Sequence, residues 1–388
     1  MSALSEQDLT ELAQWRRLLH AAPEISDEER ETAARVQDAL RGARPARVID
    51  RLGGWGVAAL FEGAEPGPCV MVRAELDALP IEERGSAAHR SRVIGRAHLC
   101  GHDGHMATLM GLARRLRSQP PLRGRVWLLF QPAEETGAGA AAVIEDPRYR
   151  SQIAPHYAFA LHNLPGVPLG EAIVPVGPAN CASAGLRLRF KGRTAHAGSP
   201  ETGLAPTPVL AELLSRLNAM GAPGARADGT LPDAFAMCTV THARLGEPTF
   251  GIAPGEAELF VTLRTLRDPE MAALRAEVEA LARHLTERHQ LELGIEEHDT
   301  FRACTNHADA AAILRRAAEA TGLRWHPGPP LRASEDFGRF GADARSAMLF
   351  LGAGATHPAL HDPDYDFPDA LIGSGVDLLE HAMRSLTG

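Results

Sequence analysis

The stretch "HLCGHDGH", from His98 to His105, places one cysteine, three histidines and one aspartate within eight residues. Thiolate, imidazole and carboxylate groups are the usual protein ligands of zinc and related metals. Cys100 and His102 are the ligand candidates here. We expect Asp103 to lie near the start of a helix and to orient a ligand, and His98 and His105 to support or pack. A metal site would need further ligands from other parts of the chain.

Four apolar runs elsewhere in the chain end abruptly in polar residues, and they lie at 68–77, 124–135, 156–165 and 346–362. Continuous apolar runs of this length are typical of strands that are buried on both faces. The segment 103–118 has its apolar residues at helical spacing. The sequence therefore predicts an α/β domain with a mixed, mostly parallel sheet covered by helices.

The polar residues at the ends of these runs are the remaining candidates: Glu75, Asp77, Glu134, Glu135, His162, His357 and His361. In open α/β sheets, ligands bind at the carboxyl ends of the strands, so these side chains are expected to converge. Cys100, His102, Glu135, His162 and His361 are enough ligands for two metal ions. Histidine and carboxylate suit zinc, manganese or cobalt, and the thiolate favours zinc. The adjacent Glu134 would stay free to take a proton from a metal-activated water.

Residues 181–298 have a different pattern. The stretch "GLRLRFKG" alternates apolar and basic residues, which is typical of a strand in an antiparallel sheet with one wet face. A helix (205–220), two strands (236–245 and 257–265), a helix (268–289) and a strand (291–297) are expected to follow. This βαββαβ order predicts a ferredoxin-like α+β domain inserted into the larger one. The expected domains are 1–180 and 299–388 (catalytic) and 181–298 (inserted), with a hinge at 175–180.

Two helices are expected before the first apolar run. Ser5 and Asp8 have capping-box spacing at the start of the first helix, and Pro23 follows its end. Ser26 and Glu29 repeat the signal for a second helix that would continue to about Arg41.

The composition narrows the range of partners and compartments. The 388 residues are 45% apolar, with no apolar run long enough to cross a membrane and no expected secretory signal. The net charge of −9 argues against nucleic acid as the main partner. The five cysteines are scattered and odd in number, which favours reduced thiols in the cytoplasm.

These motifs resemble the M20 metallopeptidase family, in particular its amidohydrolase branch of aminoacylase-like, hippurate-hydrolase-like and auxin-conjugate-hydrolase-like enzymes. The resemblance rests on "RAELDALPIEE" (73–83), "HLCGHDGHMATLMG" (98–111), "FQPAEETGAGA" (130–140), "LHNLPGVPLG" (161–170), "GRTAHAGSP" (192–200), "SEDF" (334–337) and "LHDPDYDFPD" (360–369). It implies a catalytic α/β domain with a two-metal centre and an inserted lid domain that often dimerises.

Carried onto this chain, the resemblance implies a set of roles. The metal ligands would be Cys100, His102, Glu135, His162 and His361, the general base would be Glu134, and His196 in the lid would reach the substrate or its oxyanion. The chain departs from the family pattern at four positions, where it has Glu75 for aspartate, Leu99 for alanine, Ala195 for glycine and Gly251 for asparagine.

The predicted activity is metal-dependent hydrolysis of the amide bond of N-acyl amino acids or related small amide conjugates, by a homodimer formed through the lid. A dipeptidase or an aromatic-amine hydrolase could use the same metal centre. A metal-stabilised binding protein without turnover is the alternative from another class. The Glu134–Glu135 pair argues against it, because binding a metal needs only one of the two.

Overall fold

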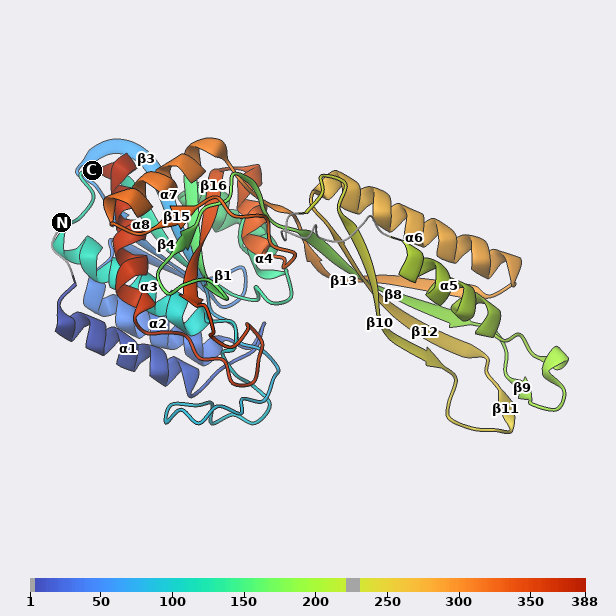
Figure 1. Ribbon diagram of the computed structural model, residues 1–388. Coiled ribbons are helices and arrows are strands. Elements are labelled where there is room, and N and C mark those ends of the chain that lie inside the picture. Colours follow the sequence, from blue (N-terminus) through green and yellow to red (C-terminus); the bar gives the residue numbers. More distant parts are fainter. Residues whose placement is uncertain (1–3, 221–230) are drawn as a thin grey trace. The chain divides into compact units, whose positions relative to one another are not determined.

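A computed structural model describes residues 4–220 and 231–388, and the chain folds into two compact units (Figure 1). Unit 1 comprises the described residues up to Ala179 together with Cys304–Gly328 and Asp336–Gly388. Unit 2 comprises the described residues of Asn180–Ala303 together with Pro329–Glu335. The chain thus leaves unit 1 twice, first to build most of unit 2 and later to add the short stretch Pro329–Glu335. Within the described ranges, no helix combines the length and the apolar character that crossing a membrane requires.

Unit 1 is built on an eight-stranded sheet with the order β1-β2-β4-β3-β5-β16-β6-β15. Its strands are β1 Arg47–Leu52, β2 Gly56–Glu62, β3 Glu65–Glu75, β4 Arg123–Gln131, β5 Tyr157–Pro165, β6 Ala172–Ile173, β15 Trp325–His326 and β16 Arg345–Gly354. The neighbours β4, β3, β5 and β16 run parallel, and β1, β2 and β6 add antiparallel pairs. The predicted mixed, mostly parallel sheet is confirmed, and the four apolar runs correspond to its parallel strands.

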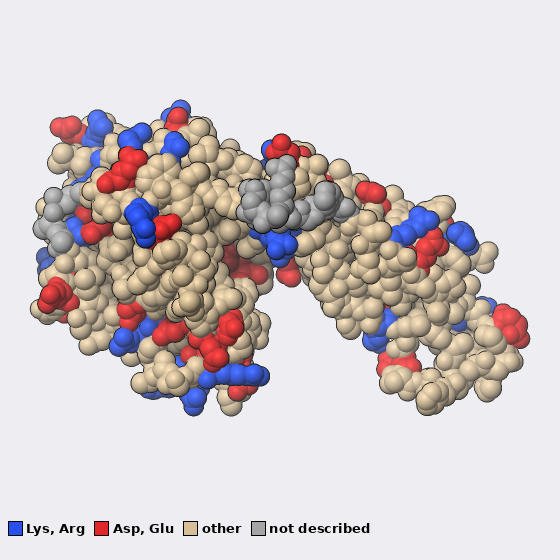
Figure 2. All heavy atoms as spheres, in the orientation of Figure 1, with Lys and Arg blue, Asp and Glu red and all other residues tan. Residues whose placement is uncertain are grey.

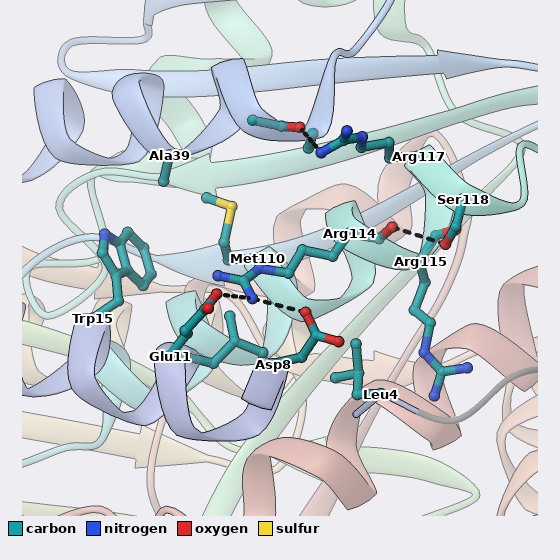
Figure 3. Close-up of a pocket in the computed structure, with 13 residues that line it drawn as sticks. Leu4, Asp8, Glu11, Trp15, Ala39, Met110, Arg114, Arg115, Arg117 and Ser118 are labelled. Atoms are coloured by element: carbon teal, nitrogen blue, oxygen red, sulfur yellow. Dashed lines mark hydrogen bonds and ion pairs between the residues drawn. The ribbon is translucent and has the colours of Figure 1, made fainter. Parts of the chain in front are cut away.

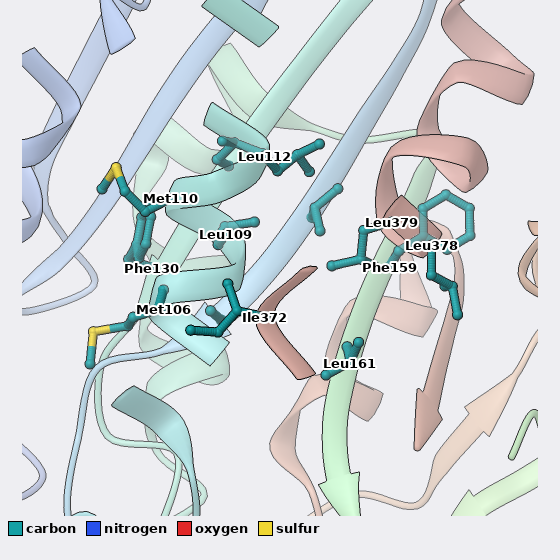
Figure 4. Close-up of a cluster of buried hydrophobic side chains, with 14 of the residues drawn as sticks. Met106, Leu109, Met110, Leu112, Phe130, Phe159, Leu161, Ile372, Leu378 and Leu379 are labelled. Atoms are coloured by element: carbon teal, nitrogen blue, oxygen red, sulfur yellow. The ribbon is translucent and has the colours of Figure 1, made fainter. Parts of the chain in front are cut away.

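Helices cover this sheet and supply much of the unit 1 core (Figure 4). They are α1 Glu6–His20, α2 Arg30–Ala43, α3 His102–Ser118, α4 Gly139–Glu145, α7 Ala308–Ala320 and α8 Leu371–Thr387. Helices α3 and α8 pack against β3, and α7 packs against β16. The central helix α3 is buried along nearly its whole length. It therefore has a fixed place at the middle of the fold.

The starts of the helices test the capping predictions. Helix α1 has the predicted capping box, in which Ser5 and Asp8 satisfy each other's backbone amides. The second predicted helix is present as α2, but its predicted capping box is wrong, because this helix begins at Arg30 without a side-chain cap. Ser26 instead donates a hydrogen bond to Asp77, and Glu29 accepts one from the backbone of Ala133. Both side chains therefore bind residues that are distant in sequence, and neither caps the helix.

Unit 2 has a four-stranded antiparallel sheet with the order β10-β12-β8-β13. Its elements are β8 Ala182–Lys191, α5 Thr207–Ala219, β10 Ala236–Leu245, β12 Glu256–Thr265, α6 Asp268–Arg288 and β13 Glu292–Phe301. From edge to edge, these are the second, third, first and fourth strands of a βαββαβ unit, which is the ferredoxin-like arrangement. Strand β8 alternates as predicted, with buried Leu188 and Phe190 on one face and exposed Arg189 on the other.

Two small sheets complete the fold. Strand β7 (Gly177–Asn180) pairs with β14 (Cys304–Asn306), so the stretch expected to be a hinge contains a strand. Strand β9 (Ala195–His196) pairs with β11 (Ile252–Ala253) in unit 2. On the face of each unit that Figure 2 shows, acidic and basic side chains are interspersed. That mixed surface shows no extended patch of one sign of charge.

Candidate metal centre

The six candidate residues of unit 1 come together from four segments. Cys100 precedes α3, His102 is its first residue, Glu134 and Glu135 follow β4, His162 lies in β5, and His361 lies between β16 and α8. Ligand atoms within 4.8 Å of one another occur in three overlapping groups: Cys100, His102 and His162; Cys100, Glu135 and His361; and His102, Glu134 and Glu135. Only His162 differs from its expected position, because β5 continues beyond it to Pro165.

His102 is held in a fixed orientation by Asp77. Its Nδ1 lies 2.8 Å from the backbone carbonyl of Asp77, and because a carbonyl can only accept, Nδ1 donates. In the neutral ring the lone pair is therefore on Nε2, which is buried and has no hydrogen-bond partner among the described residues. This Nε2 lies 3.9 Å from a Glu134 oxygen and 3.8 Å from a Glu135 oxygen. An imidazole arranged in this way is suited to bind a metal through Nε2.

The charges around His102 favour a cation at this place. Burial lowers the pKa of His102, but the hydrogen bond to Asp77 and the charges of Glu75 and Glu135 outweigh burial and raise the pKa to about 10. The negative potential that favours a proton on this ring would equally favour a divalent cation beside it.

His162 and His361 also present Nε2 to the centre. His162 donates from Nδ1 to the backbone carbonyl of Asn163 over 2.7 Å, and its Nε2 lies 3.4 Å from Cys100 Sγ. His361 Nε2 lies 3.7 Å from a Glu135 oxygen. Burial is the largest cause that lowers the pKa of His162, and the nearby His105 imidazole adds to it. The pKa of His361 is lowered as well, but its side chain is 48% exposed, so desolvation has a smaller effect there. These shifts favour the neutral imidazole, which is the form that binds metals.

Cys100 completes the donor set. Its side chain is buried, and burial together with the charges of Glu135 and Glu134 raises the pKa of its thiol well above the usual range. A divalent cation would offset these carboxylates and stabilise the thiolate. Three imidazole nitrogens, a thiol and carboxylates, all facing one another, fit a site for borderline transition metals.

The turn that carries Glu134 and Glu135 is fixed by two buried aspartates. The backbone amide of Glu135 donates to Asp77 Oδ2 over 2.9 Å, and Glu134 Oε1 accepts from the backbone of Asp336 over 3.4 Å. Asp336 also accepts from the Gln131 side chain before the turn and from the Ala140 amide after it, each over 2.8 Å. Both ends of the turn are therefore attached to the same carboxylate.

The prediction that Asp103 orients a ligand is wrong. Its Oδ2 lies 2.9 Å from both Arg16 and His20, away from the candidate ligands. Asp77 is the residue that orients His102. The error arose because Asp103 is adjacent to His102 in sequence, whereas successive residues at a helix start point in different directions.

The other histidines of the stretch have supporting positions. His105 Nδ1 lies 2.7 Å from a Glu75 oxygen, and its Nε2 lies 2.7 Å from Asn163 Oδ1. Glu75, one of the four residues that depart from the family pattern, also forms an ion pair with Arg73. His98 is buried, and neither of its ring nitrogens has a hydrogen-bond partner in the described part of the chain.

The remaining candidate, His196, belongs to unit 2. It is exposed, and its Nδ1 accepts a hydrogen bond from the Gly198 amide over 3.0 Å. Strand pairing aligns His196 with Ile252 and Ala195 with Ala253, and the Ala197 amide donates to the Gly251 carbonyl. Two of the four departures from the family pattern, Ala195 and Gly251, therefore lie beside His196.

Three buried residues that support the site were not singled out from the sequence: Arg73, Gln131 and Asp336. Arg73 donates to Gln131 over 2.9 Å and to Asp336 over 2.6 Å. An arginine inside a predicted buried strand was a usable signal, because a buried charge requires a partner. One partner, Glu75, lies only two positions away in the sequence, but Asp336 could not be expected, since it lies 263 positions further along the chain.

A cavity of about 660 Å³ in unit 1 has no candidate residue in its lining (Figure 3). It lies beside α1, α2 and the second half of α3, including Trp15, Met110 and Arg114. With a rise of 1.5 Å per residue, Met110 is about 12 Å along α3 from His102. Arg114 is paired with Asp8 and Glu11 across the cavity wall. This cavity is therefore separate from the candidate metal centre.

Known proteins resemble this chain over nearly its whole length. Residues 71–385 match the model of peptidase family M20/M25/M40. An N-acetyl-L-cysteine deacetylase of Bacillus subtilis is 30% identical over 377 residues, which cover 96% of this chain and 87% of the relative. An N-acetyldiaminopimelate deacetylase of Enterococcus faecalis is 27% identical over 386 residues, which cover 99% of each.

The fold is also shared with solved structures. A dinuclear metal binding peptidase of the M20 family from Bacillus subtilis has a TM-score of 0.81 at 24% identity, covering 98% of this chain and 99% of its own. The length of the family match and the coverage of the relatives leave no large part of the chain unexplained. This chain belongs to the M20/M25/M40 peptidase family and is a metal-dependent M20-type amidohydrolase, an enzyme that cleaves carbon–nitrogen bonds.

Proposed function

We propose that this enzyme hydrolyses N-acyl amino acids or related small amide conjugates with two divalent metal ions held by Cys100, His102, Glu135, His162 and His361. The observation that carries the proposal is the geometry of His102, whose Nε2 faces Glu134 and Glu135 while Asp77 fixes its Nδ1. The deacetylase relatives from Bacillus subtilis and Enterococcus faecalis support the class of substrate.

The chemistry divides between the bound metals and the protein. Divalent ions at this place would polarise the acyl carbonyl and lower the pKa of an attacking water. Glu134 accepts the proton of that water and passes it to the leaving amine. The Asp336 amide keeps Glu134 Oε1 in position for both transfers. His196 is proposed to stabilise the oxyanion of the tetrahedral intermediate.

The donor set guides the proposed choice of metal. Imidazole and carboxylate ligands suit zinc, manganese and cobalt alike, and the Cys100 thiolate adds a preference for zinc. Activity of the protein reconstituted separately with each of the three metals distinguishes these choices.

We further propose a homodimer formed through unit 2. Strand β10 lies at an edge of its sheet, and its residues from Thr241 to Leu245 are exposed. An edge strand of this kind can pair with a strand of another chain. Sedimentation velocity over a range of protein concentrations tests this state. A cytoplasmic location is also proposed, supported by the five free cysteines, and cell fractionation tests it.

Paired variants test the roles of the two glutamates. We expect Glu134→Gln to keep both metals but to lower kcat by about 10²- to 10⁴-fold, as removal of a general base does. We expect Glu135→Gln to lose metal, because a neutral amide replaces a charged ligand. Metal content by elemental analysis and amide hydrolysis are measured on the same samples. Full activity of metal-loaded Glu134→Gln would refute the proposed mechanism.

A substrate panel tests the proposed reaction. N-acetyl amino acids and hippurate are compared with dipeptides and with aromatic amides, each at equal concentration and with added metal. We expect the N-acyl amino acids to be cleaved fastest. Preference for dipeptides or aromatic amides would assign the same centre to a different substrate, and no turnover of any amide would favour a binding protein.

A further inference from the structure

A buried arginine from the first helix lies among three carboxylates. The Arg16 side chain is 1% exposed. It forms ion pairs with Asp103 at 2.9 Å, with Asp366 at 2.8 Å and with Asp369 at 2.6 Å. These three acids come from two distant parts of the chain, so one guanidinium connects α1 to both of them.

The two parts joined by Arg16 each carry a proposed metal ligand. Asp103 directly follows His102 at the start of α3. Asp366 and Asp369 belong to residues 355–370, the segment between β16 and α8 that contains His361. Arg16 itself lies in α1 and is not one of the proposed ligands. It can therefore act on the metal centre only by positioning other residues.

The segment 355–370 needs such support because it contains no helix or strand. His361 has a φ of +67°, a left-handed conformation that non-glycine residues rarely adopt unless their surroundings impose it. Its amide donates to the Leu99 carbonyl over 2.8 Å, and the Tyr365 hydroxyl accepts from the Asn163 side chain over 2.6 Å. The pairs with Asp366 and Asp369 are the ionic part of this attachment.

The cluster around Arg16 is not itself suited to a cation. His20, His89 and Asp366 have ligand atoms close enough to hold a metal. However, Arg16 Nη2 lies 3.1 Å from His89 Nε2, and Arg16 Nη1 lies 2.8 Å from Asp366 Oδ1. The guanidinium charge is therefore already present where a metal would have to bind.

We propose that Arg16 is a positioning residue for the metal centre, which holds the His361 segment against the start of α3; this inference rests on the proposed role of His361 as a ligand. The planar guanidinium offers five N–H donors in a fixed geometry, so it can serve several carboxylates at once. A lysine ammonium is a point charge and cannot reproduce this arrangement.

A second buried arginine provides the matched control. Arg115 lies near the other end of α3 and pairs with Asp377 at 2.6 Å and Glu380 at 2.9 Å, both in α8. It also is a buried arginine that connects two parts of unit 1, although the Asp377 side chain is 45% exposed, and neither of its partners lies in the His361 segment. Loss of Arg115 reports the general cost of removing such a connection.

The experiment compares Arg16→Met, Arg16→Lys, Asp366→Asn and Arg115→Met in the full chain. Asp366 is included because its side chain is 33% exposed, so Asp366→Asn is tolerated even if Arg16→Met does not fold. Backbone hydrogen exchange of residues 355–370 is measured in metal-free protein. Zinc affinity is measured by competition with a chromogenic chelator.

We expect the changes at Arg16 and Asp366 to accelerate exchange in 355–370 and to weaken zinc binding about 10- to 100-fold, the usual effect of losing a residue that supports a ligand. Arg115→Met should alter neither. Unchanged exchange in 355–370 for both Arg16→Met and Asp366→Asn overturns the inference, as does faster exchange with unchanged zinc affinity. If wild-type protein binds no zinc, the proposed function fails, while the exchange data still decide whether Arg16 holds the segment.

Discussion

The buried rings of His20 and His98 in unit 1 differ in the protonation state that they favour, although their centres are only 6.4 Å apart. His20 has an oxygen of Asp103 2.9 Å from Nδ1 and an oxygen of Glu83 3.3 Å from Nε2. Burial lowers the pKa of His20, but these acids outweigh burial and raise the pKa to about 10. His98 has no such partners, and burial lowers its pKa to about 4. Both rings are buried, so the carboxylates beside His20 account for the difference in charge between the two.

The raised pKa of His20 predicts a pH dependence of stability. Its stabilising effect is fully present below pH 6.5 and is lost as the pH rises toward 10, because only the folded state keeps the proton in that window. The slope in the free energy of unfolding approaches about 1.4 kcal/mol per pH unit. Urea denaturation of wild type and His20→Gln between pH 7 and 9 measures it.

Comparison with His20→Gln isolates the effect of the His20 proton, because the flanking charged residues are the same in both proteins. Arg16, His89 and Asp366 also lie beside His20, and they are unchanged in His20→Gln. The advantage of wild type over His20→Gln should therefore shrink as the pH rises. A constant difference across this range would show that His20 is neutral in the folded protein.

At the scale of elements, two glycines allow the start of α3 to lie close to other segments. Gly101 has a φ of +95°, and a Cβ there would overlap the side-chain oxygen of Asn163 in β5. A Cβ at Gly104 would overlap the ring of Phe367, which lies in the His361 segment. The stretch that carries Cys100 and His102 can approach both segments only because these positions lack a side chain.

Gly104→Ala is therefore expected to destabilise unit 1 by about 1–3 kcal/mol, the usual cost of overpacking a core. Gly42→Ala is the matched control, because Gly42 also lies in a helix but has nothing within 4 Å of the added Cβ. This control should gain about 0.5–1 kcal/mol from helix propensity. Urea denaturation gives both values, and equal effects of the two substitutions would contradict the packing argument.

Elements were predictable from the sequence where local pattern decides the structure. The parallel strands of unit 1 are continuous apolar runs, and β8 alternates strictly, so both sheets could be recognised. The antiparallel pair β1 and β2 was not predicted. Ser26 failed as a local helix signal because Asp77, which is distant in sequence, binds it instead. Asp103 does lie in the first turn of α3, but Arg16 binds its carboxylate, so it does not orient a ligand.

Most candidate ligands were predictable because they lie at or near the end of an element, and His361 lies in the segment that follows β16. Their supporting partners were not, since Asp77, Asp336 and Arg16 act through contacts that only the folded chain creates. The sequence identifies which side chains can bind a metal. It does not identify which of several nearby acids will orient them.

At the scale of the whole molecule, the two units have separate hydrophobic cores. The core of unit 1 includes residues of β3, β4 and α3, and that of unit 2 includes residues of β8, β12 and α6. All six candidate residues that converge lie in unit 1. Units with their own cores can unfold in separate transitions, and a ligand stabilises only the unit that binds it.

Metal removal should therefore destabilise unit 1 and leave unit 2 unchanged. The chain's four tryptophans, Trp15, Trp55, Trp127 and Trp325, all belong to unit 1, so tryptophan fluorescence follows the unfolding of that unit alone. Far-ultraviolet circular dichroism follows both units. A metal present at 100 times its dissociation constant adds about 2.7 kcal/mol to the stability of the state that binds it.

With a chelator, we expect the fluorescence midpoint of thermal unfolding to fall. Circular dichroism should also show a second transition that the fluorescence lacks. This transition reports the unfolding of unit 2, and its midpoint should stay unchanged. Adding zinc back should restore the first transition, which excludes an effect of the chelator itself. If both transitions move together, the two units unfold as one cooperative block, and the separate cores do not behave as separate folding units.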